Sequence, residues 1–438
     1  MWTIWHAWSG VISRTIEPRS LLSAAAVRNT AQRVLALALS GSLEDWAVDR
    51  DRLPHVADFV AAVVRDRYPS LNPPVHARWR HFVLGDRDLW SEIAKARTWT
   101  SPEARARAAF DLAITSVLLD AGAGSTWQYH DAATGLTAAR SEGLALASLR
   151  WFERGGLSDR ASQPAGPAAS EGPAAGEGPG ADLLRADAGA LERVDARAVE
   201  EAFQSCAERP LQGAAGRAVL LNRLGAAVRA RPDLFALADE PRPGGLFDAL
   251  VARAPASGGR RQISAAAVLD VLLEGLGSIW PGRPQLDGVP LGDCWLYPPL
   301  DGFVPLHKLS QWLAYSLIEP LEQAGLQVVD VGALTGLAEY RNGGLFVDLG
   351  VLIPRQTSAF SKVHDVASEF VVGWRAMTVA LLDELAPMVA SRLGSSAAEF
   401  PLARVLEGGT WAAGRRVARQ KRADAGPPFQ ISSDGTVF

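Results

Sequence analysis

Residues 103–119 constrain the fold of this chain more than any other segment. They follow Ser101-Pro102, a helix cap with proline in the first turn, and they end before Gly122 and Gly124. From Ala108 to Leu119 such a helix is apolar nearly all round, so we expect it to be buried on most sides. The rest of the chain must therefore supply the elements that surround it.

The other strong periodic signals are also helical. Further helices are expected at residues 21–39, 141–152, 217–229, 264–276, 307–323 and 366–392, with Ser23 as the cap of the first. Strand signals are confined to two short apolar runs, 327–331 and 345–353. The βαβ alternation, the GxGxxG and GxxxxGK[ST] phosphate loops and any repeat of 20 to 50 residues are absent. The sequence predicts a mainly α fold with a few short strands.

Two segments differ from this pattern. Residues 1–19 begin with a tryptophan-rich stretch that has no basic region or cleavage site, and we interpret them as an N-terminal extension of uncertain role. Residues 161–181 consist almost entirely of Ala, Gly, Pro, Ser and Glu, a composition that cannot bury a core. We expect a disordered surface insertion there. The remainder of 20–438 is predicted to form a single compact α-rich catalytic unit.

Composition excludes several classes of partner. A net charge of −4 and a pI of about 6.0 provide no basic field for nucleic acid, and no apolar run is long enough to predict a membrane span. The two cysteines, Cys206 and Cys294, lack metal-ligand spacing, which argues against a disulfide framework or a thiolate zinc site and favours a reducing cytoplasm. We expect no metal and no cofactor. Of 44 basic residues only four are lysine (Lys95, Lys308, Lys362, Lys421), so arginine accounts for 44 − 4 = 40.

Polar residues that could bind a ligand gather in five short stretches, three of them before residue 150. Arg78 and His81 belong to a basic stretch that could bind an anion or could be a solvated turn. Asp120, with Trp127 nearby, would follow the buried helix where the helix dipole disfavours a carboxylate, so this acid needs a partner or has a function. Arg140 is a ligand candidate, whereas Ser141 and Glu142 fit ordinary helix-start chemistry.

The fourth stretch combines charged, amide and aromatic side chains on one expected helix. His307, Gln311 and Tyr315 are spaced i, i+4 and i+8, and Lys308 and Trp312 follow the adjoining row. Such a helix start could hold a phosphate and flank a flat group, although an aromatic face can also be simple core.

The fifth stretch runs from Leu334 to Gly350. Glu339, Tyr340 and Arg341 precede the pair Gly343-Gly344, which we expect to form a turn where backbone can approach a ligand. Glu339 could act as a base or stabilise positive charge on a sugar ring, or it could be paired with an arginine. Later stretches at 406–411 and 433–438 carry turn signals and receive no role.

Several strings in these stretches resemble a known family. HxRWRHF, SVLLDAGAG, RSEGLA, HKLSQWLAYSLIEPL, LTGLxEYRNGGLF, LEGGTWAAGR and the terminal SDGTVF look like the family encoded in bacterial and fungal uracil-catabolism gene clusters. The resemblance covers about residues 20–438. It implies a pathway that proceeds through ribosylurea-type intermediates to urea.

A more distant similarity is to queuosine 5′-phosphate N-glycosylases. It is carried by Lys308, Gln311, Leu334-Thr335, Glu339-Tyr340-Arg341, Gly350-Val351-Leu352, Glu369 and Arg375. It implies a compact helical domain resembling helix-hairpin-helix DNA-glycosylase folds. Two positions depart from that pattern: Glu339 stands where the relative has Asp, and Gly373 stands where an acid is expected.

Together these resemblances imply hydrolysis of the N-glycosidic bond of a phosphorylated riboside, with ribosylurea 5-phosphate giving urea and ribose 5-phosphate. Glu339 would stabilise the oxocarbenium-like transition state, Lys308 with Arg341 or His307 would hold the phosphate, and Trp312, Tyr315 or Trp127 would wall the pocket. Two alternatives stay open. One is an amidohydrolase acting on the urea group, and the other is a non-catalytic sensor of the same ligand. The sequence is compatible with a homo-oligomer.

Overall fold

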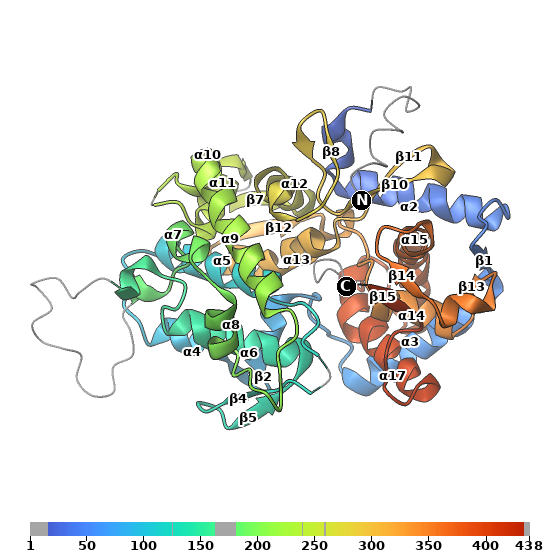
Figure 1. Ribbon diagram of the computed structural model, residues 1–438, viewed down its shortest axis with the longest axis horizontal. Coiled ribbons are helices and arrows are strands. Elements are labelled where there is room, and N and C mark those ends of the chain that lie inside the picture. Colours follow the sequence, from blue (N-terminus) through green and yellow to red (C-terminus); the bar gives the residue numbers. More distant parts are fainter. Residues whose placement is uncertain (1–15, 125, 163–180, 239, 258–259, 433–438) are drawn as a thin grey trace, which may run out of the picture. The chain divides into compact units, whose positions relative to one another are not determined.

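The chain is described by a computed structural model that covers residues 16–124, 126–162, 181–238, 240–257 and 260–432 (Figure 1). Contacts divide the chain into two compact units. Of the described residues, unit 1 contains those of 16–76, 282–311 and 332–432, and unit 2 contains those of 77–281 and 312–331. Most of the predicted extension 1–19 and of the predicted insertion 161–181 lies outside the described residues. The extension, the insertion and the single catalytic unit therefore stay predictions.

Helices dominate both units, which confirms the mainly α fold, whereas the helix-hairpin-helix architecture stays a prediction. The α-helices of unit 1 are α2 (Ala24–Leu39), α3 (Leu53–Arg67), α14 (Tyr340–Asp348), α15 (Glu369–Arg392), α16 (Leu402–Val405) and α17 (Trp411–Lys421). Those of unit 2 are α4 (Leu89–Lys95), α5 (Pro102–Leu118), α6 (Arg140–Glu153), α7 (Ala188–Glu192), α8 (Ala196–Ala202), α9 (Ala214–Ala230), α10 (Pro232–Phe235), α11 (Leu246–Arg253) and α12 (Ala265–Leu276). Helix α13 (Lys308–Gln323) contributes its first turn to unit 1 and the rest to unit 2.

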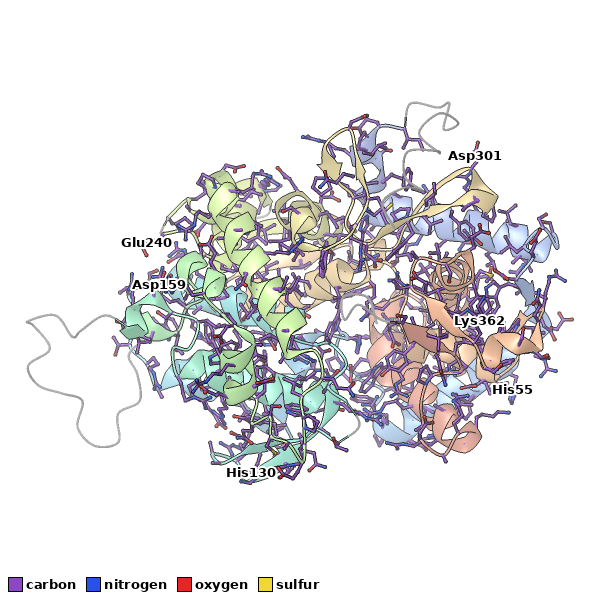
Figure 2. All side chains as sticks on the ribbon, in the orientation of Figure 1. His55, His130, Asp159, Glu240, Asp301 and Lys362 are labelled. Atoms are coloured by element: carbon purple, nitrogen blue, oxygen red, sulfur yellow. The ribbon has the colours of Figure 1, made fainter. Side chains whose placement is uncertain are left out.

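Strands in the described residues are short and form small sheets. In unit 1, β1 (Trp46–Val48) pairs with β13 (Leu352–Pro354), β8 (Gln285–Leu286) with β9 (Val289–Pro290), β10 (Cys294–Tyr297) with β11 (Gly302–Pro305), and β14 (Val363–Asp365) with β15 (Gln430–Ser432). In unit 2, β2 (Val83–Leu84) pairs with β3 (Arg87–Asp88), β4 (Tyr129–Asp131) with β5 (Leu136–Ala138), and β7 (Arg260–Ser264) lies between β6 (Ala256–Ser257) and β12 (Leu326–Val329). His130, labelled in Figure 2, belongs to the β4–β5 hairpin.

Unit 1 is built around α15. This helix is buried along most of its length, from Phe370 to Ala390, and it packs against α2, α3 and α14 (Figure 1). Ser23 caps α2 by accepting the amide of Ala26 at 3.1 Å, as its position in the sequence predicts. The core of unit 1 therefore follows the expected helical periodicity.

Unit 2 has α5 as its central helix. Its residues from Ala108 to Leu118 are all buried, which confirms that the helix is surrounded, and it packs against α6, α9 and α11. Ser101 caps this helix and Pro102 opens it, also as predicted. Asp111 is fully buried here, and burial raises its pKa to about 6 although Arg242 and the Gly244 and Ala186 amides oppose the rise.

The strand prediction was correct for one run and partly wrong for the other. Residues 326–329 form β12, close to the predicted 327–331. Residues 345–348 instead complete helix α14, and only Leu352–Pro354 are extended as β13. Apolar runs of this length do not distinguish strand from buried helix, and the cap at Glu339 decides in favour of the helix.

Candidate functional site

In unit 1, the start of α13 is fixed by Asp293 and His307. His307 directly precedes the helix in a left-handed conformation with φ 47°, and its carbonyl accepts the hydrogen bond of the Gln311 amide at 2.8 Å. Its ring is 1% exposed and its Nε2 donates to the carbonyl of Leu21 at 2.9 Å. Nδ1 has no hydrogen-bond partner among the residues described. Burial lowers the pKa of His307, and the hydrogen bond to Leu21 and the charge of Asp293 offset only part of this effect. The lowered pKa favours the neutral ring.

Asp293 is the polar centre of this region, and sequence analysis missed it. Its carboxylate accepts hydrogen bonds from both terminal nitrogens of Arg375, at 2.8 and 2.7 Å. It also accepts hydrogen bonds from the Lys308 amide at 3.0 Å and from the Trp295 indole at 2.7 Å. Burial alone would raise the pKa of Asp293, but the charge and hydrogen bonds of Arg375 outweigh it and hold that pKa well below its usual value. The carboxylate is therefore ionised, and it orients both Arg375 and the first turn of α13.

Glu339 caps helix α14. One carboxylate oxygen accepts a hydrogen bond from the backbone amide of Arg341 at 2.8 Å, and the other accepts one from the backbone amide of Asn342 at 2.7 Å. The residue is 8% exposed, and burial raises its pKa, opposed by these two amides and by the charges of Lys308 and Arg341. Arg375 donates from Nε to the carbonyl of Ala338, next to Glu339, at 3.1 Å. The structure thus brings together Lys308, Glu339, Arg341 and Arg375, four of the predicted site residues.

Gln311 and Thr335 hold the segment before Glu339 in place. The Gln311 amide nitrogen donates to the Thr335 hydroxyl, and its oxygen accepts the Thr335 amide at 2.9 Å. Both side chains are fully buried. Arg341 donates to the carbonyl of Ala425 at 2.9 Å and covers the ring of Tyr340, with 4.6 Å from Cζ to the ring centroid. Gln311 therefore positions the Glu339 segment.

The expected turn at Gly343-Gly344 is wrong, because both glycines lie inside α14. The reason is close packing: a Cβ on Gly343 would lie 2.7 Å from Nε1 of Trp374, and one on Gly344 would lie 3.2 Å from Pro428. Glycine here permits a helix to approach its neighbours, and tertiary packing outweighs its low helix propensity.

We expect Gly343→Ala to lower the free energy of unfolding by about 1–3 kcal/mol, since the added methyl group overpacks the contact with Trp374 and Thr378. Gly216→Ala is the matched control, because Gly216 is an exposed residue of α9 with open space around it. That change should stabilise the chain by about 0.5–1 kcal/mol. Urea unfolding of both variants measures the difference, and equal effects at the two sites would contradict the packing argument.

In unit 2, a second polar cluster surrounds Arg78, which is fully buried. Its guanidinium donates to the Ser116 hydroxyl at 2.7 Å and the Ser141 carbonyl at 2.9 Å, and it forms an ion pair with Asp120 at 3.2 Å. Burial lowers the pKa of Arg78, opposed by the charges of Asp120 and Glu142. Asp120 therefore has the partner that its position after α5 requires.

His81 and Trp312 belong to the same cluster. His81 Nδ1 lies 3.2 Å from an Arg78 nitrogen, and the rings of His81 and Trp312 meet edge to face at 6.2 Å. The Arg78 guanidinium lies 5.8 Å from the centroid of the Trp312 ring. The arginine and imidazole of the first polar stretch and the indole of the fourth thus come together in unit 2.

Other predicted residues of unit 2 have different surroundings. Trp127 is 1% exposed and donates to the carbonyl of Phe203 at 2.9 Å, so it is part of the core. Tyr315 is equally buried. Arg140 is exposed and adopts φ 56° at the start of α6. Ala139 is the cap residue of this helix, and Ser141 and Glu142 lie in its first turn, where the Ser141 hydroxyl donates to Asp120 at 3.0 Å.

The Leu406–Thr410 segment, which received no role from the sequence, forms a buried π-helical turn in unit 1. The carboxylate of Glu407 in this turn accepts hydrogen bonds from Nδ1 of His76 at 2.7 Å and from the Tyr68 hydroxyl at 3.2 Å. Gly409 lets the turn approach α3, since a Cβ there would lie 2.5 Å from Val60. Turns of this type often mark functional sites.

Within the described ranges, no three His, Cys, Asp or Glu side chains are grouped so as to hold a metal ion. No described helix is both long and apolar enough to cross a membrane. Cys294 is fully buried, and burial raises the pKa of its thiol, so the thiol stays protonated.

Comparisons with known proteins extend over nearly the whole chain. It is 36% identical to "Protein urg3" of Schizosaccharomyces pombe over 429 residues, which cover 95% of this chain and 98% of the relative. It is 33% identical to "Uracil catabolism protein 4" of Lachancea kluyveri over 457 residues, with the same coverage. These relatives confirm the family resemblance drawn from the sequence strings, whereas the similarity to queuosine 5′-phosphate N-glycosylases stays a prediction. The model of the family described as "Protein of unknown function (DUF1688)" matches residues 20–438, and the chain therefore belongs to that family.

Proposed function

We propose that this chain is a cytoplasmic hydrolase of uracil catabolism that cleaves the N-glycosidic bond of a 5′-phosphorylated riboside. The substrate that fits best is ribosylurea 5-phosphate. Water attacks C1 of the ribose, the C1–N bond breaks, and urea and ribose 5-phosphate are released. The name of the Lachancea kluyveri relative supports the pathway.

One observation carries the reaction type: Glu339 is a buried carboxylate on which the positive charges of Lys308 and Arg341 act. Cleavage of an N-glycosidic bond builds positive charge on C1 and the ring oxygen, and a fixed carboxylate in a dry site stabilises that charge. Lys308 is a compact cation suited to a phosphate, which would supply binding energy remote from the reacting bond.

A second observation favours a urea leaving group. Asn342 follows Glu339 by three residues, is 2% exposed, and donates through its nitrogen to the carbonyl of Leu337 at 3.2 Å. Its side-chain oxygen has no hydrogen-bond partner in the part of the chain that the structure describes. A buried acceptor without a donor is costly, and the N–H groups of a urea would satisfy it.

The test is direct. Purified protein is mixed with ribosylurea 5-phosphate, and in a parallel reaction with UMP, and the release of urea, uracil and ribose 5-phosphate is quantified. We expect urea and ribose 5-phosphate in equal amounts from the first substrate. If neither substrate releases its leaving group, the glycosidase proposal is wrong.

The non-catalytic alternative also has an observation in its favour. Both oxygens of Glu339 already accept amides at the start of α14, which is what a purely structural helix cap does. In that case the protein would bind or sense the phosphorylated riboside without turning it over. Binding of ribosylurea 5-phosphate to the wild type, measured by calorimetry and unaccompanied by urea release, would favour this alternative.

A further inference from the structure

Unit 2 contains a cavity that none of the candidate site residues lines. Its volume is about 460 Å³, within the usual range for small-molecule sites. It is open to one side and is lined by α4, the segment after it, the first half of α5 and the end of α13. Its lining includes Trp90, Trp99, Pro102, Arg105, Pro320 and Gln323.

The cavity has a fixed aromatic wall. Trp99 is half-buried, and its indole nitrogen donates to the carbonyl of Ala94 at 2.8 Å, so the ring is held in one orientation. Trp90 lies behind it, with 6.3 Å between the ring centroids and an interplanar angle of 53°. Trp90 is 1% exposed, and its indole nitrogen has no hydrogen-bond partner among the residues described. A held, accessible indole is a stacking platform for a flat ring.

The cavity also has a cation that no carboxylate neutralises within the described residues. Arg105 is half-buried, and its guanidinium takes part in no hydrogen bond or ion pair there. The neighbouring Arg107 differs, since it pairs with Asp248 through two bonds of 2.7 and 2.9 Å, and Glu103 interacts with Arg107. A guanidinium left without an acid beside an aromatic wall is suited to an anionic group.

We propose that this cavity is a second ligand site, which binds a planar heteroaromatic ring carrying an anionic group, the chemistry of a pyrimidine mononucleotide. The ring stacks on Trp99, the anionic group binds Arg105, and the exposed amide of Gln323 reaches the polar edge of the ring. Pro102 and Pro320 form apolar walls. None of the residues assigned to hydrolysis lines this cavity, so binding here is separate from the proposed reaction.

Calorimetric titrations of the full chain with UMP, uridine and ribose 5-phosphate test the proposal. They are made in the Glu339→Gln background, so that hydrolysis does not consume the ligand and the outcome does not depend on the proposed reaction. We expect Arg105→Gln and Trp99→Leu each to weaken UMP binding at this site by roughly tenfold, whereas Trp99→Phe retains most of it. Uridine, which lacks the charge, and ribose 5-phosphate, which lacks the ring, should both bind more weakly.

Arg223→Gln is the matched control, because Arg223 is an exposed arginine of α9 in the same unit, outside the cavity. It should bind UMP like the Glu339→Gln parent protein. The proposal is overturned if that parent protein does not bind UMP, or if Arg105→Gln binds it as Arg223→Gln does. Arg105-dependent binding of ribose 5-phosphate as tight as that of UMP would also overturn it, since the aromatic wall would then have no role.

Discussion

Replacing Glu339 with glutamine is expected to reduce urea release from ribosylurea 5-phosphate by about a hundredfold to a thousandfold. The substitution keeps the size of the side chain and removes the negative charge that would stabilise the oxocarbenium-like transition state. The change is measured as kcat/KM with purified protein. Binding of the substrate should be retained, because the phosphate is held elsewhere.

Glutamine also weakens the cap of α14, because its amide has one acceptor oxygen for the two backbone N–H groups that Glu339 now satisfies. The cost is about 1 kcal/mol. Ser23→Ala is the matched control, since it removes the cap of α2 in the same unit and should cost a similar amount while leaving turnover unchanged. If both variants lose stability and neither loses turnover, Glu339 is only a cap.

The pH profile provides a second measurement on Glu339. Because burial raises its pKa, the carboxylate takes up a proton at a higher pH than an exposed glutamate, whose pKa is about 4.3. The reaction needs the ionised form, so activity should fall on the acid side well before pH 4.3 is reached. Glu339→Asp should keep the cap and shorten the reach by one methylene, and so lower the rate without abolishing it.

Removing either partner of the Asp293–Arg375 pair should have the largest effect on stability, about 3–5 kcal/mol. Arg375 is 1% exposed, and Asp293→Asn would leave its charge buried without a counter-ion. The start of α13 would also lose the carboxylate that holds the Lys308 amide. Urea unfolding of Asp293→Asn, Arg375→Met and the double variant measures the coupling energy between the two side chains. The double variant should lose less free energy of unfolding than the two single variants lose together.

The control for this pair is Glu384→Gln, which breaks the more exposed ion pair with Arg50 in the same unit. It should cost at most about 1 kcal/mol. Equal losses in Glu384→Gln and Asp293→Asn would show that burial does not decide the strength of the pair.

The same pair predicts how stability depends on pH. The folded pKa of Asp293 is lowered, so its contribution is complete above the pKa of the unfolded chain, about 3.9, and is lost as the pH falls toward the folded value. The difference in the free energy of unfolding between wild type and Asp293→Asn should therefore be larger at pH 7 than at pH 3. An unchanged difference would mean that the carboxylate is not held in its ionised form.

Much of the secondary structure could be predicted because its signals are local. The caps at Ser23 and Ser101 lie within three residues of the amides they satisfy, and the apolar face of α5 repeats within a single helix. The glycines of α14 misled the prediction, because their role depends on Trp374 and Pro428, which are remote in sequence. The bond from Ser141 to Asp120 could not be predicted for the same reason, since the two residues belong to different segments.

The sequence by itself determined the mainly α fold, the burial of α5, the family, and the stretches in which the polar residues gather. Only the tertiary structure decided which of them meet: Asp293 with Arg375 across 82 residues, and Arg78 with Asp120 and Trp312. Helical periodicity and capping are set by neighbouring residues, whereas an ion pair between distant residues forms only when packing removes both groups from water together. That is why Lys308 and Glu339 could be chosen from the sequence, while Asp293, which orients the helix start beside them, could not.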